Sequence, residues 1–107
     1  MNAWVYILRC RDGKYYVGSA RGDLGRRVDE HNAGVYPGFT KSRRPVVLVY
    51  AQDFDRIADA IAAERQLKGW SRAKKEALIA GDFDMLKKLS QNHAVMLRRA
   101  HPSTSSG

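Results

Sequence analysis

An Asp12-Gly13 pair between two strand-like runs is the feature of this sequence that most constrains its fold. Tyrosine and β-branched residues are frequent on both sides of the pair within residues 5–18. Asp-Gly between two runs of this kind is a strong signal for a β-hairpin. The N-terminal part of the chain is therefore predicted to be a pair of antiparallel strands.

The pairing register of this hairpin decides where Tyr6 and Tyr16 point. A two-residue loop places the two rings on opposite faces of the sheet. A three-residue loop, with Gly13 as a left-handed bulge residue, instead pairs Tyr6 with Gly18 and puts both rings on one face. In that arrangement Gly18 is expected to leave room for a ligand near the backbone. Ordinary core packing of the two aromatic rings is the alternative explanation.

The charge balance favours an anionic partner. The 107 residues contain 19 Lys and Arg against 11 Asp and Glu, a formal net charge of +8, and 44% of the residues are hydrophobic. A chain of this length and composition is expected to fold as one domain. Nucleic acid is the first candidate partner, ahead of an anionic membrane surface.

Neither a membrane span nor a disulfide is expected. No apolar run approaches the roughly 20 residues that a membrane-spanning helix needs. The single cysteine, Cys10, permits no internal disulfide, which is typical of a reducing compartment. The sequence is thus interpreted as a soluble cytoplasmic protein without a membrane partner.

A short helix is predicted after the hairpin. Asp23 can cap it, Leu24 begins it, and Gly34 suits the left-handed position that follows a helix. Arg27 and His31 are four residues apart, so they lie on neighbouring turns of one helical face. Both polar side chains are expected at the edge of the buried face.

A basic, hydroxyl-rich loop and a strand follow this helix. The loop residues proposed to contact phosphates are Thr40, Lys41, Arg43 and Arg44. A solvated loop beside a strand edge is the alternative explanation for the same charges. After the loop, the continuous apolar run 46–50 predicts a strand that is buried on both faces.

The next predicted helix carries an unexpected carboxylate. Asp53 or Asp55 can cap this helix, which is expected to end near Lys68. Glu64 falls among its apolar positions, and a buried carboxylate is costly unless it is paired or holds a metal ion. An ion pair with an arginine such as Arg27 and a metal-binding or catalytic role remain as alternatives.

Two further helices and a tail complete the chain. Ser71 is expected to cap a helix through Ala80, and a short amphipathic helix then runs from Phe83 to about residue 91. Residues 92–107 lack the apolar content that keeps a segment ordered. The predicted organisation is one domain over 1–91 and a disordered basic, Ser-rich tail over 92–107.

These residues supply the parts that phosphodiester hydrolysis requires. A carboxylate can hold a divalent ion, an arginine can neutralise charge on the phosphate, and a tyrosine or histidine can accept a proton from water. The sequence contains no Walker loop, His-Glu-x-x-His helix or Gly-x-Ser-x-Gly elbow. It thus points to metal-assisted hydrolysis of nucleic acid.

The ordered series of motifs resembles the GIY-YIG nuclease superfamily. Val5-Tyr6-Ile7 and Tyr16-Val17-Gly18 match its two name-giving tripeptides, with Val5 in place of Gly and Val17 in place of Ile. The resemblance continues through 26–32, 40–50 and the helix that carries Glu64, and covers roughly the first ninety residues. Small stand-alone bacterial members of the YhbQ-like branch are the most similar in size.

The resemblance implies an α/β (α+β) domain, with a three-stranded antiparallel sheet flanked by helices in the order β-β-α-β-α-α. It also implies a metal-dependent endonuclease in DNA repair, recombination or nucleic-acid processing, acting on DNA first and RNA second. The implied catalytic residues are Tyr6, Tyr16, Arg27, His31 and Glu64. Glu64 would hold a single Mg²⁺ or Mn²⁺.

Two other functions are compatible with the same sequence. The first is a nucleic-acid-binding module of the same fold that does not cleave. The second is a subunit whose nuclease activity needs a protein partner. The combination of Tyr6, Tyr16, Arg27 and Glu64 favours the nuclease, because simple phosphate binding does not require a buried carboxylate on a cationic surface.

Overall fold

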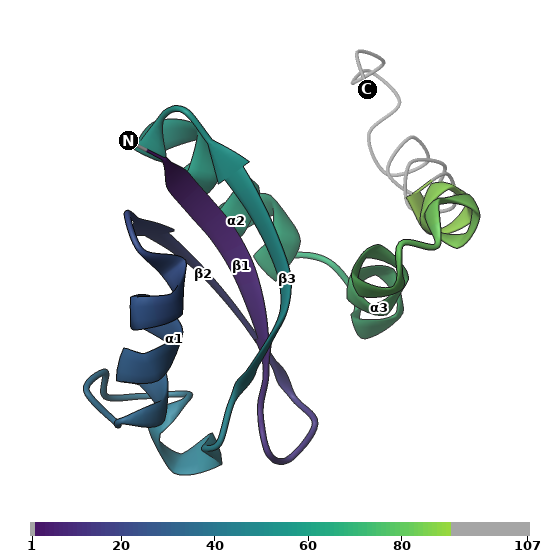
Figure 1. Ribbon diagram of the computed structural model, residues 1–107. Helices are drawn as coiled ribbons and strands as arrows, with labels where there is room; N and C mark the ends of the chain where they lie inside the picture. Colours follow the sequence, from purple (N-terminus) through teal and green to yellow (C-terminus); the bar gives the residue numbers. More distant parts are fainter. Residues whose placement is uncertain (1, 91–107) are drawn as a thin grey trace. The chain divides into compact units, whose positions relative to one another are not determined.

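The computed structural model describes residues 2–90. Its elements are β1 (Ala3–Arg9), β2 (Tyr15–Arg21), α1 (Leu24–Asn32), the 3-10 helix η1 (Lys41–Arg43), β3 (Val47–Phe54), α2 (Ile57–Lys68) and α3 (Arg72–Ala80) (Figure 1). This order confirms the expected β-β-α-β-α-α arrangement. The chain divides after Gly69 into two compact units, the first of which contains the sheet, α1 and α2.

The hairpin that joins β1 to β2 has a three-residue loop, one of the two alternatives that the sequence left open. Gly13 is left-handed, with φ +84°. The Gly13 N–H donates to the Cys10 carbonyl at 2.9 Å, and the Cys10 N–H donates to the Lys14 carbonyl at 2.8 Å. Tyr6 consequently pairs with Gly18, as the bulge register requires. Tyr6 and Tyr16 therefore face the same side of the sheet.

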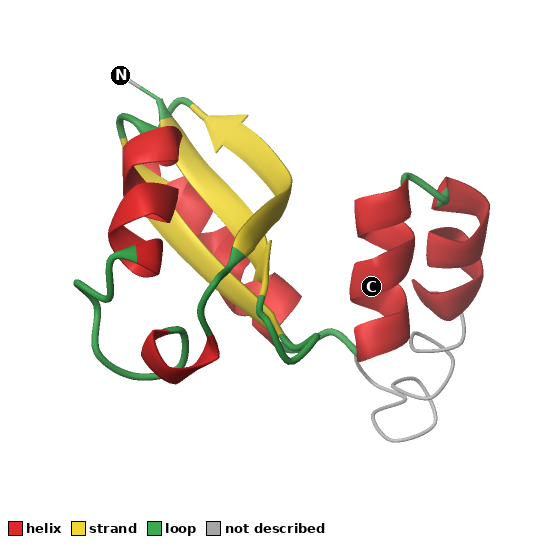
Figure 2. Cartoon of the chain, turned by 60° about the horizontal axis from the view of Figure 1, so that its bottom comes forward, coloured by secondary structure: helices red, strands yellow, loops and turns green. Residues whose placement is uncertain are grey.

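The sheet has the strand order β2-β1-β3 with both pairings antiparallel, so β1 is its central strand. Helices α1 and α2 cover opposite faces of the sheet (Figures 1 and 2). On the α1 face, Leu24 and Val28 of α1 pack against a buried cluster of Tyr6, Leu8, Cys10, Ala20 and Val46. On the other face, the alternate residues Val5, Ile7 and Val17 are buried.

The expectation of a strand buried on both faces was wrong for the run 46–50. Val46 is buried, but the side chains of Val47 and Leu48 are 51% and 38% exposed. The strand β3 pairs only with β1 and lies at the edge of the sheet. Burial on both faces belongs instead to β1, because the central strand has a neighbour on each side and a helix over each face.

Two of the three predicted helix caps are confirmed. The carboxylate of Asp23 accepts a hydrogen bond from the Arg26 N–H at 3.1 Å, and Ser71 caps α3 through the Lys74 N–H at 3.2 Å. The prediction that Asp53 or Asp55 caps α2 was wrong. The cap position is Arg56, which makes no side-chain capping bond, because β3 continues through Phe54 and includes Asp53.

The second compact unit contains α3 and a further helical stretch over 83–90. Gly81 ends α3 in the left-handed conformation, with φ +71°. The predicted end of the last helix near residue 91 and the predicted tail over 92–107 lie outside the described residues. Within residues 2–90, every helix is too short or too polar to cross a bilayer.

Candidate active site

Tyr6 is the centre of the candidate site. It projects from the central strand β1 toward α1 and is only 1% exposed. Its ring centroid lies 6.4 Å from that of Tyr16 and 6.1 Å from that of His31. The Tyr16 and His31 rings lie 5.2 Å apart. Three of the predicted catalytic side chains therefore meet on the α1 face of the hairpin.

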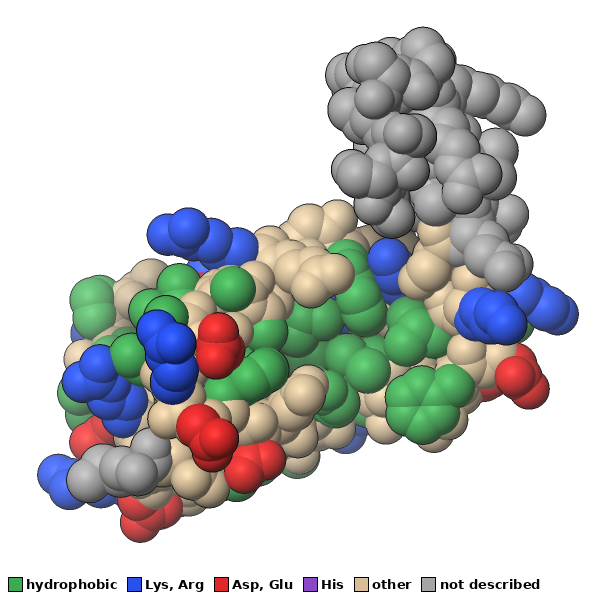
Figure 3. All heavy atoms as spheres, turned by 90° about the horizontal axis from the view of Figure 1, so that it is seen from above, with side chains coloured by type: hydrophobic (Ala, Val, Ile, Leu, Met, Phe, Trp, Pro, Cys, Tyr) green, Lys and Arg blue, Asp and Glu red, His purple; other side chains and the backbone are tan. Residues whose placement is uncertain are grey.

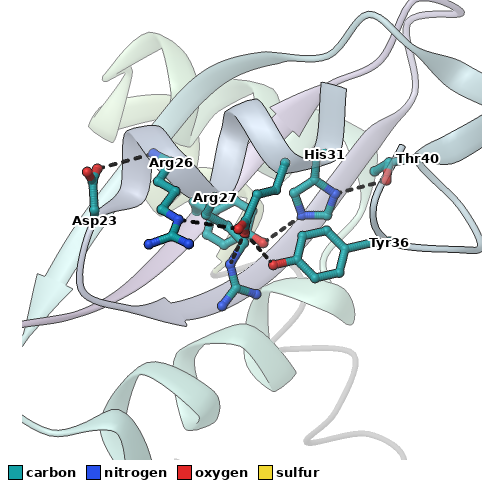
Figure 4. Close-up of polar contacts among 8 residues, drawn as sticks. Asp23, Arg26, Arg27, His31, Tyr36 and Thr40 are labelled. Carbon is teal, nitrogen blue, oxygen red and sulfur yellow. Dashed lines mark hydrogen bonds and ion pairs between the residues drawn. The ribbon is translucent and has the colours of Figure 1, made fainter. Parts of the chain in front are cut away.

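A buried chain of hydrogen bonds fixes two of these groups. The Tyr6 hydroxyl lies 3.0 Å from Nε2 of His31, and Nδ1 of His31 lies 2.9 Å from Oγ1 of Thr40 (Figure 4). His31 and Thr40 are 3% and 2% exposed. Each ring nitrogen of a buried histidine needs a partner, and both nitrogens have one here. Thr40 thereby determines the orientation of the imidazole.

Burial keeps both members of the Tyr6–His31 pair uncharged. Burial raises the pKa of Tyr6 well above its ordinary value, so its phenol remains protonated. Burial, followed by the nearby Arg27 charge, lowers the pKa of His31 below its ordinary value. At neutral pH the pair is thus a phenol hydrogen-bonded to a neutral imidazole.

Gly18 and Thr40 have different roles from those expected. A Cβ added at Gly18 would lie 2.6 Å from the Tyr6 hydroxyl oxygen and 3.0 Å from a ring carbon of Tyr16. The space beside Gly18 is therefore filled by the two tyrosines and is not available to a ligand. Thr40 is buried against His31, so its hydroxyl is not presented to a phosphate in solution.

Arg27 lies beside a carboxylate that the sequence did not single out. The Glu30 carboxylate is 4.0 Å from Nε of Arg27 and 3.5 Å from Nε of Arg26, and it accepts a hydrogen bond of 2.7 Å from the Tyr36 hydroxyl. That hydrogen bond, together with the two arginines, holds the pKa of Glu30 below its ordinary value. The Arg27 guanidinium also stacks 5.1 Å from the Tyr36 ring centroid.

The positively charged groups of α1 border an open hollow. Its volume is about 420 Å³, and its lining residues are Arg21, Gly22, Asp23, Arg26, Arg27, Glu30 and Tyr36. Arg27 is partly exposed there, with 32% of its side-chain surface accessible. An anion entering the hollow can reach Arg27 without any rearrangement of the buried Tyr6–His31 pair.

Glu64 is paired with Lys68 and not with Arg27, which corrects the ion pair considered from the sequence. Nζ of Lys68 lies 2.6 Å from Oε2 of Glu64, one helical turn away on α2. The Ser19 hydroxyl donates to the other carboxylate oxygen at 2.5 Å. The Glu64 side chain is 20% exposed, so it lies at the rim of the buried face and not within it.

Edge strand β2 brings Glu64 toward the tyrosines although α1 and α2 cover opposite faces of the sheet. Ser19 of β2 holds the Glu64 carboxylate at this edge. Burial is the main cause of the raised pKa of Tyr6, but the charges of Arg27 and Glu64 also act on it. Arg27 and Glu64 are therefore close enough to Tyr6 for their charges to affect its pKa.

The surroundings of Glu64 fit a single divalent ion. Burial acts to raise the pKa of Glu64, but hydrogen bonds from Lys68 and Ser19 outweigh it and hold the pKa below its ordinary value. The carboxylate is thus ionised at neutral pH, and the Lys68 ammonium shows that this position accepts a cation. Mg²⁺ commonly binds through one or two carboxylates and retains water molecules as its other ligands. Among residues 2–90, no group of three or more His, Cys, Asp or Glu side chains forms a fuller metal site.

The cationic residues predicted to contact phosphates differ in their exposure and in the interactions that they already make within the protein. Nε of Arg43 lies 3.1 Å from an Asp12 carboxylate oxygen, and its guanidinium covers the Phe39 ring at 4.0 Å. Arg44 donates to two backbone carbonyls and keeps a partly exposed side chain. Lys41 is exposed. Lys41 and Arg44 are therefore better placed than Arg43 to meet a phosphate.

Four residues of the site were not identified from the sequence. They are Ser19, Glu30, Tyr36 and Lys68. Helical spacing was an available signal for two of them, because Glu30 follows Arg27 by three residues and Lys68 follows Glu64 by four. Tyr36 had no such signal, because a loop of irregular conformation carries it back over α1.

Comparisons with known proteins agree with the motifs and the fold. A family model described as the GIY-YIG catalytic domain matches residues 2–77. The chain is 43% identical over 77 residues to a UPF0213 protein of Staphylococcus saprophyticus, which covers 72% of this chain and 93% of that protein. It is 46% identical over 74 residues to a UPF0213 protein of Halobacterium salinarum, covering 69% of this chain and 95% of that protein.

A solved structure also matches. The solution NMR structure of a protein from E. faecalis superimposes with a TM-score of 0.53 at 28% sequence identity. The match covers 78% of this chain and 88% of that chain. Both the sequence and the fold therefore relate this chain to small proteins, most of whose length the matches cover.

Proposed function

Because the chain belongs to the GIY-YIG catalytic-domain family, we propose that it is a metal-dependent endonuclease that hydrolyses phosphodiester bonds in nucleic acid. The observation that carries this proposal is the meeting of Tyr6, Tyr16 and His31, with the charges of Arg27 and Glu64 acting on the same point. DNA is the proposed first substrate and RNA the second. The proposed setting is cytoplasmic repair, recombination or nucleic-acid processing, with a catalytic domain over 1–91.

Arg27 is the proposed contact for the phosphate that is cleaved. Its guanidinium is partly exposed in the hollow beside α1, and a guanidinium forms strong charge-assisted bonds with phosphate oxygens. Negative charge builds up on those oxygens in the transition state, so a fixed cation there lowers the barrier. The phosphate would replace Glu30 as the anionic partner of Arg27.

Tyr16 is the proposed proton acceptor for the attacking water. Tyr6 is buried and hydrogen-bonded to His31, which suits it to orienting the site rather than meeting solvent. Tyr16 is only partly buried and lies near the Lys68 ammonium, whose raised pKa is due first to Glu64 and in part to Tyr16. A positive charge beside a tyrosine favours the phenolate, which is the form that can accept a proton from the attacking water.

Glu64 is the proposed ligand of a single Mg²⁺ or Mn²⁺. Such an ion, when bound, polarises the phosphate and stabilises the leaving oxygen. Ser19 orients the carboxylate through its hydrogen bond. Lys68 must move from the carboxylate oxygen that it contacts, and its 52% exposed side chain has room to do so.

A nucleic-acid-binding module that does not cleave is the second candidate function. One observation favours it: both charged residues of the proposed mechanism already form ion pairs within the protein, Arg27 with Glu30 and Glu64 with Lys68. A site balanced in this way can remain inactive unless the substrate and the metal displace these partners. A nuclease subunit that needs a protein partner would behave in the same manner.

One set of cleavage assays distinguishes these functions. The purified protein is incubated with plasmid, single-stranded, flapped and branched DNA and with RNA, in Mg²⁺, Mn²⁺ or EDTA. Glu64→Gln and Arg27→Gln are compared with two matched surface controls, Asp59→Asn on the same helix as Glu64 and Arg56→Gln. Both controls alter exposed side chains outside the site.

The nuclease proposal expects metal-dependent cleavage that both controls retain. Loss of one catalytic charge commonly lowers the rate about 10²- to 10³-fold, so Glu64→Gln and Arg27→Gln are expected to lose at least that much. Binding without cleavage on every substrate would establish the second function. Cleavage that persists equally in Glu64→Gln would contradict the metal role of this carboxylate.

A further inference from the structure

A second hollow, separate from the one beside Arg27, opens at the C-terminal end of α1. Its volume is about 590 Å³, and its lining residues are Arg11, Asn32, Lys41, Ser42, Arg44 and Pro45. They come from the hairpin turn, the last residue of α1, and the η1 segment with the residues that follow it. The two hollows share no lining residue.

The lining of this second hollow has charge of one sign only. Three of its residues are cationic and none is acidic. The hollow beside Arg27 differs, since Asp23 and Glu30 line it together with its arginines. Elsewhere, on the face drawn in Figure 3, Asp and Glu side chains lie among the Lys and Arg side chains. A cationic lining without a carboxylate is suited to an anion.

The guanidinium of Arg44 is fixed in place before any ligand arrives. Its Nε donates to the Lys41 carbonyl at 2.8 Å, and its Nη1 donates to the Asn32 carbonyl at 3.3 Å. Gly34 makes this position possible, because an added Cβ there would lie 2.8 Å from Nη1 of Arg44. These bonds leave further guanidinium N–H groups unused, and an arginine held in advance loses less entropy when it binds an anion.

The segment that carries the hollow is itself anchored to the fold. The Asn32 amide donates to the Val46 carbonyl at 3.0 Å and accepts from the Val46 N–H at 2.7 Å. The Arg11 N–H donates to the Arg43 carbonyl at 2.9 Å, which ties the hairpin turn to η1. Backbone and side-chain hydrogen bonds thus hold in place the loop that carries the cationic groups.

We infer that this hollow binds a phosphate group, and that the phosphate belongs to the backbone of the nucleic acid whose cleavage is proposed above. This inference rests on the proposed interaction with nucleic acid. Arg27 and Asn32 are five residues apart on α1, which is about 7.5 Å along a helix axis. Neighbouring phosphates of one strand advance by about 3.4 Å along a duplex axis. The rise between these two residues therefore corresponds to about two phosphate steps of one strand.

Salt dependence of binding tests this inference. A labelled DNA duplex is titrated with wild-type protein, Lys41→Gln, Arg44→Gln and the control Arg56→Gln, in EDTA to prevent cleavage and over a series of salt concentrations. Each phosphate contact that is lost reduces the slope of log K against log salt by about 0.9. Lys41→Gln and Arg44→Gln are expected to show that reduction, while Arg56→Gln keeps the wild-type slope. Lys41 is exposed, so its variant tests the hollow even if Arg44→Gln perturbs the loop.

Two NMR titrations distinguish a nucleic-acid phosphate from a small phosphorylated ligand. The Ser42 and Arg44 amide NMR signals are followed during addition of the duplex and, separately, of inorganic phosphate. Shifts with both support a phosphate site used by the strand, whereas shifts with phosphate alone would overturn the strand assignment and indicate a small phosphorylated ligand. Slopes for Lys41→Gln and Arg44→Gln equal to that of Arg56→Gln would also overturn the inference. Because binding is measured without metal, this result is independent of whether Glu64→Gln abolishes cleavage.

Discussion

Lys68 places its ammonium nitrogen 2.6 Å from a carboxylate oxygen of Glu64, at the position proposed for a divalent ion. The pair is formed within α2, one turn apart, and the Lys68 side chain is 52% exposed. An exposed pair of this kind contributes about 0.2–1 kcal/mol. A metal ion can therefore displace Lys68, but it does so against this competing interaction.

Replacing Lys68 is expected to strengthen metal binding. In Lys68→Met the ion no longer competes with an ammonium, so the apparent Kd for Mn²⁺ should fall by up to about fivefold. Paramagnetic broadening of amide NMR signals near Glu64 measures this affinity without any cleavage assay. Lys87→Met, which removes an exposed lysine elsewhere, is the control. Unchanged or weaker Mn²⁺ binding in Lys68→Met would contradict the proposed competition.

Removing the carboxylate beside Arg27 is expected to strengthen nucleic-acid binding. Glu30 lies 4.0 Å from Nε of Arg27, where a phosphate would compete with it. In Glu30→Gln the affinity for a DNA duplex should rise about two- to fivefold at low salt, because a charge that repels the phosphate is gone. Fluorescence anisotropy measures the change. Asp29→Asn removes the same charge from the adjacent exposed position, and an equal gain in that variant would argue for a general charge effect.

The stability of the protein is expected to fall on acidification because of His31. Burial and the Arg27 charge lower the pKa of folded His31 below its ordinary value of 6.5. Between the lowered pKa and 6.5, the unfolded chain binds a proton that the folded chain does not, so the free energy of unfolding rises with pH. This contribution is complete above about pH 6.5 and is lost as the pH falls through the folded pKa.

Urea unfolding between about pH 5 and pH 8 measures this dependence. The control is His31→Gln, which retains the other two histidines of the sequence and is expected to flatten the curve in that range. An identical slope in wild-type protein and His31→Gln would show that His31 does not titrate differently in the folded state.

A side chain at position 18 is expected to disrupt the site from within the sheet. In Gly18→Ala the new Cβ would lie 2.6 Å from the Tyr6 hydroxyl oxygen, so the Tyr6 ring must shift and disturb its hydrogen bond with His31. Overpacking of this kind costs about 1–3 kcal/mol. Gly69→Ala is the matched control, because Gly69 has φ −83° and its added Cβ would meet its nearest neighbour at an ordinary 3.5 Å.

Chemical denaturation and the His31 ring signals in NMR check this prediction. Gly18→Ala should be destabilised and should shift the His31 signals, whereas Gly69→Ala should do neither. Wild-type stability together with unshifted His31 signals in Gly18→Ala would mean that the tyrosine pair does not depend on the space beside Gly18.

Local signals in the sequence predicted the hairpin and most helix boundaries, and the resemblance of its motifs to a known family supplied the five candidate catalytic residues. The Asp12-Gly13 pair marked the turn but left two registers open, and the left-handed Gly13 with its bulge decides in the structure which residues of the adjoining strands pair. Asp23 and Ser71 marked helix starts because capping is a bond between residues three positions apart. Interactions between residues that are close together in the sequence can be predicted from the sequence alone.

Only the tertiary structure decided which neighbours these residues have. The run 46–50 is apolar enough for a central strand, but the pairing order places β3 at the edge and β1 in the middle. Thr40 could not be recognised as the partner of His31, since a loop returns it to the helix. An arginine such as Arg27 was the partner considered for Glu64 from the sequence, but the structure pairs Glu64 with Lys68. Burial and pairing depend on contacts between distant segments, and these are set by how the whole chain packs.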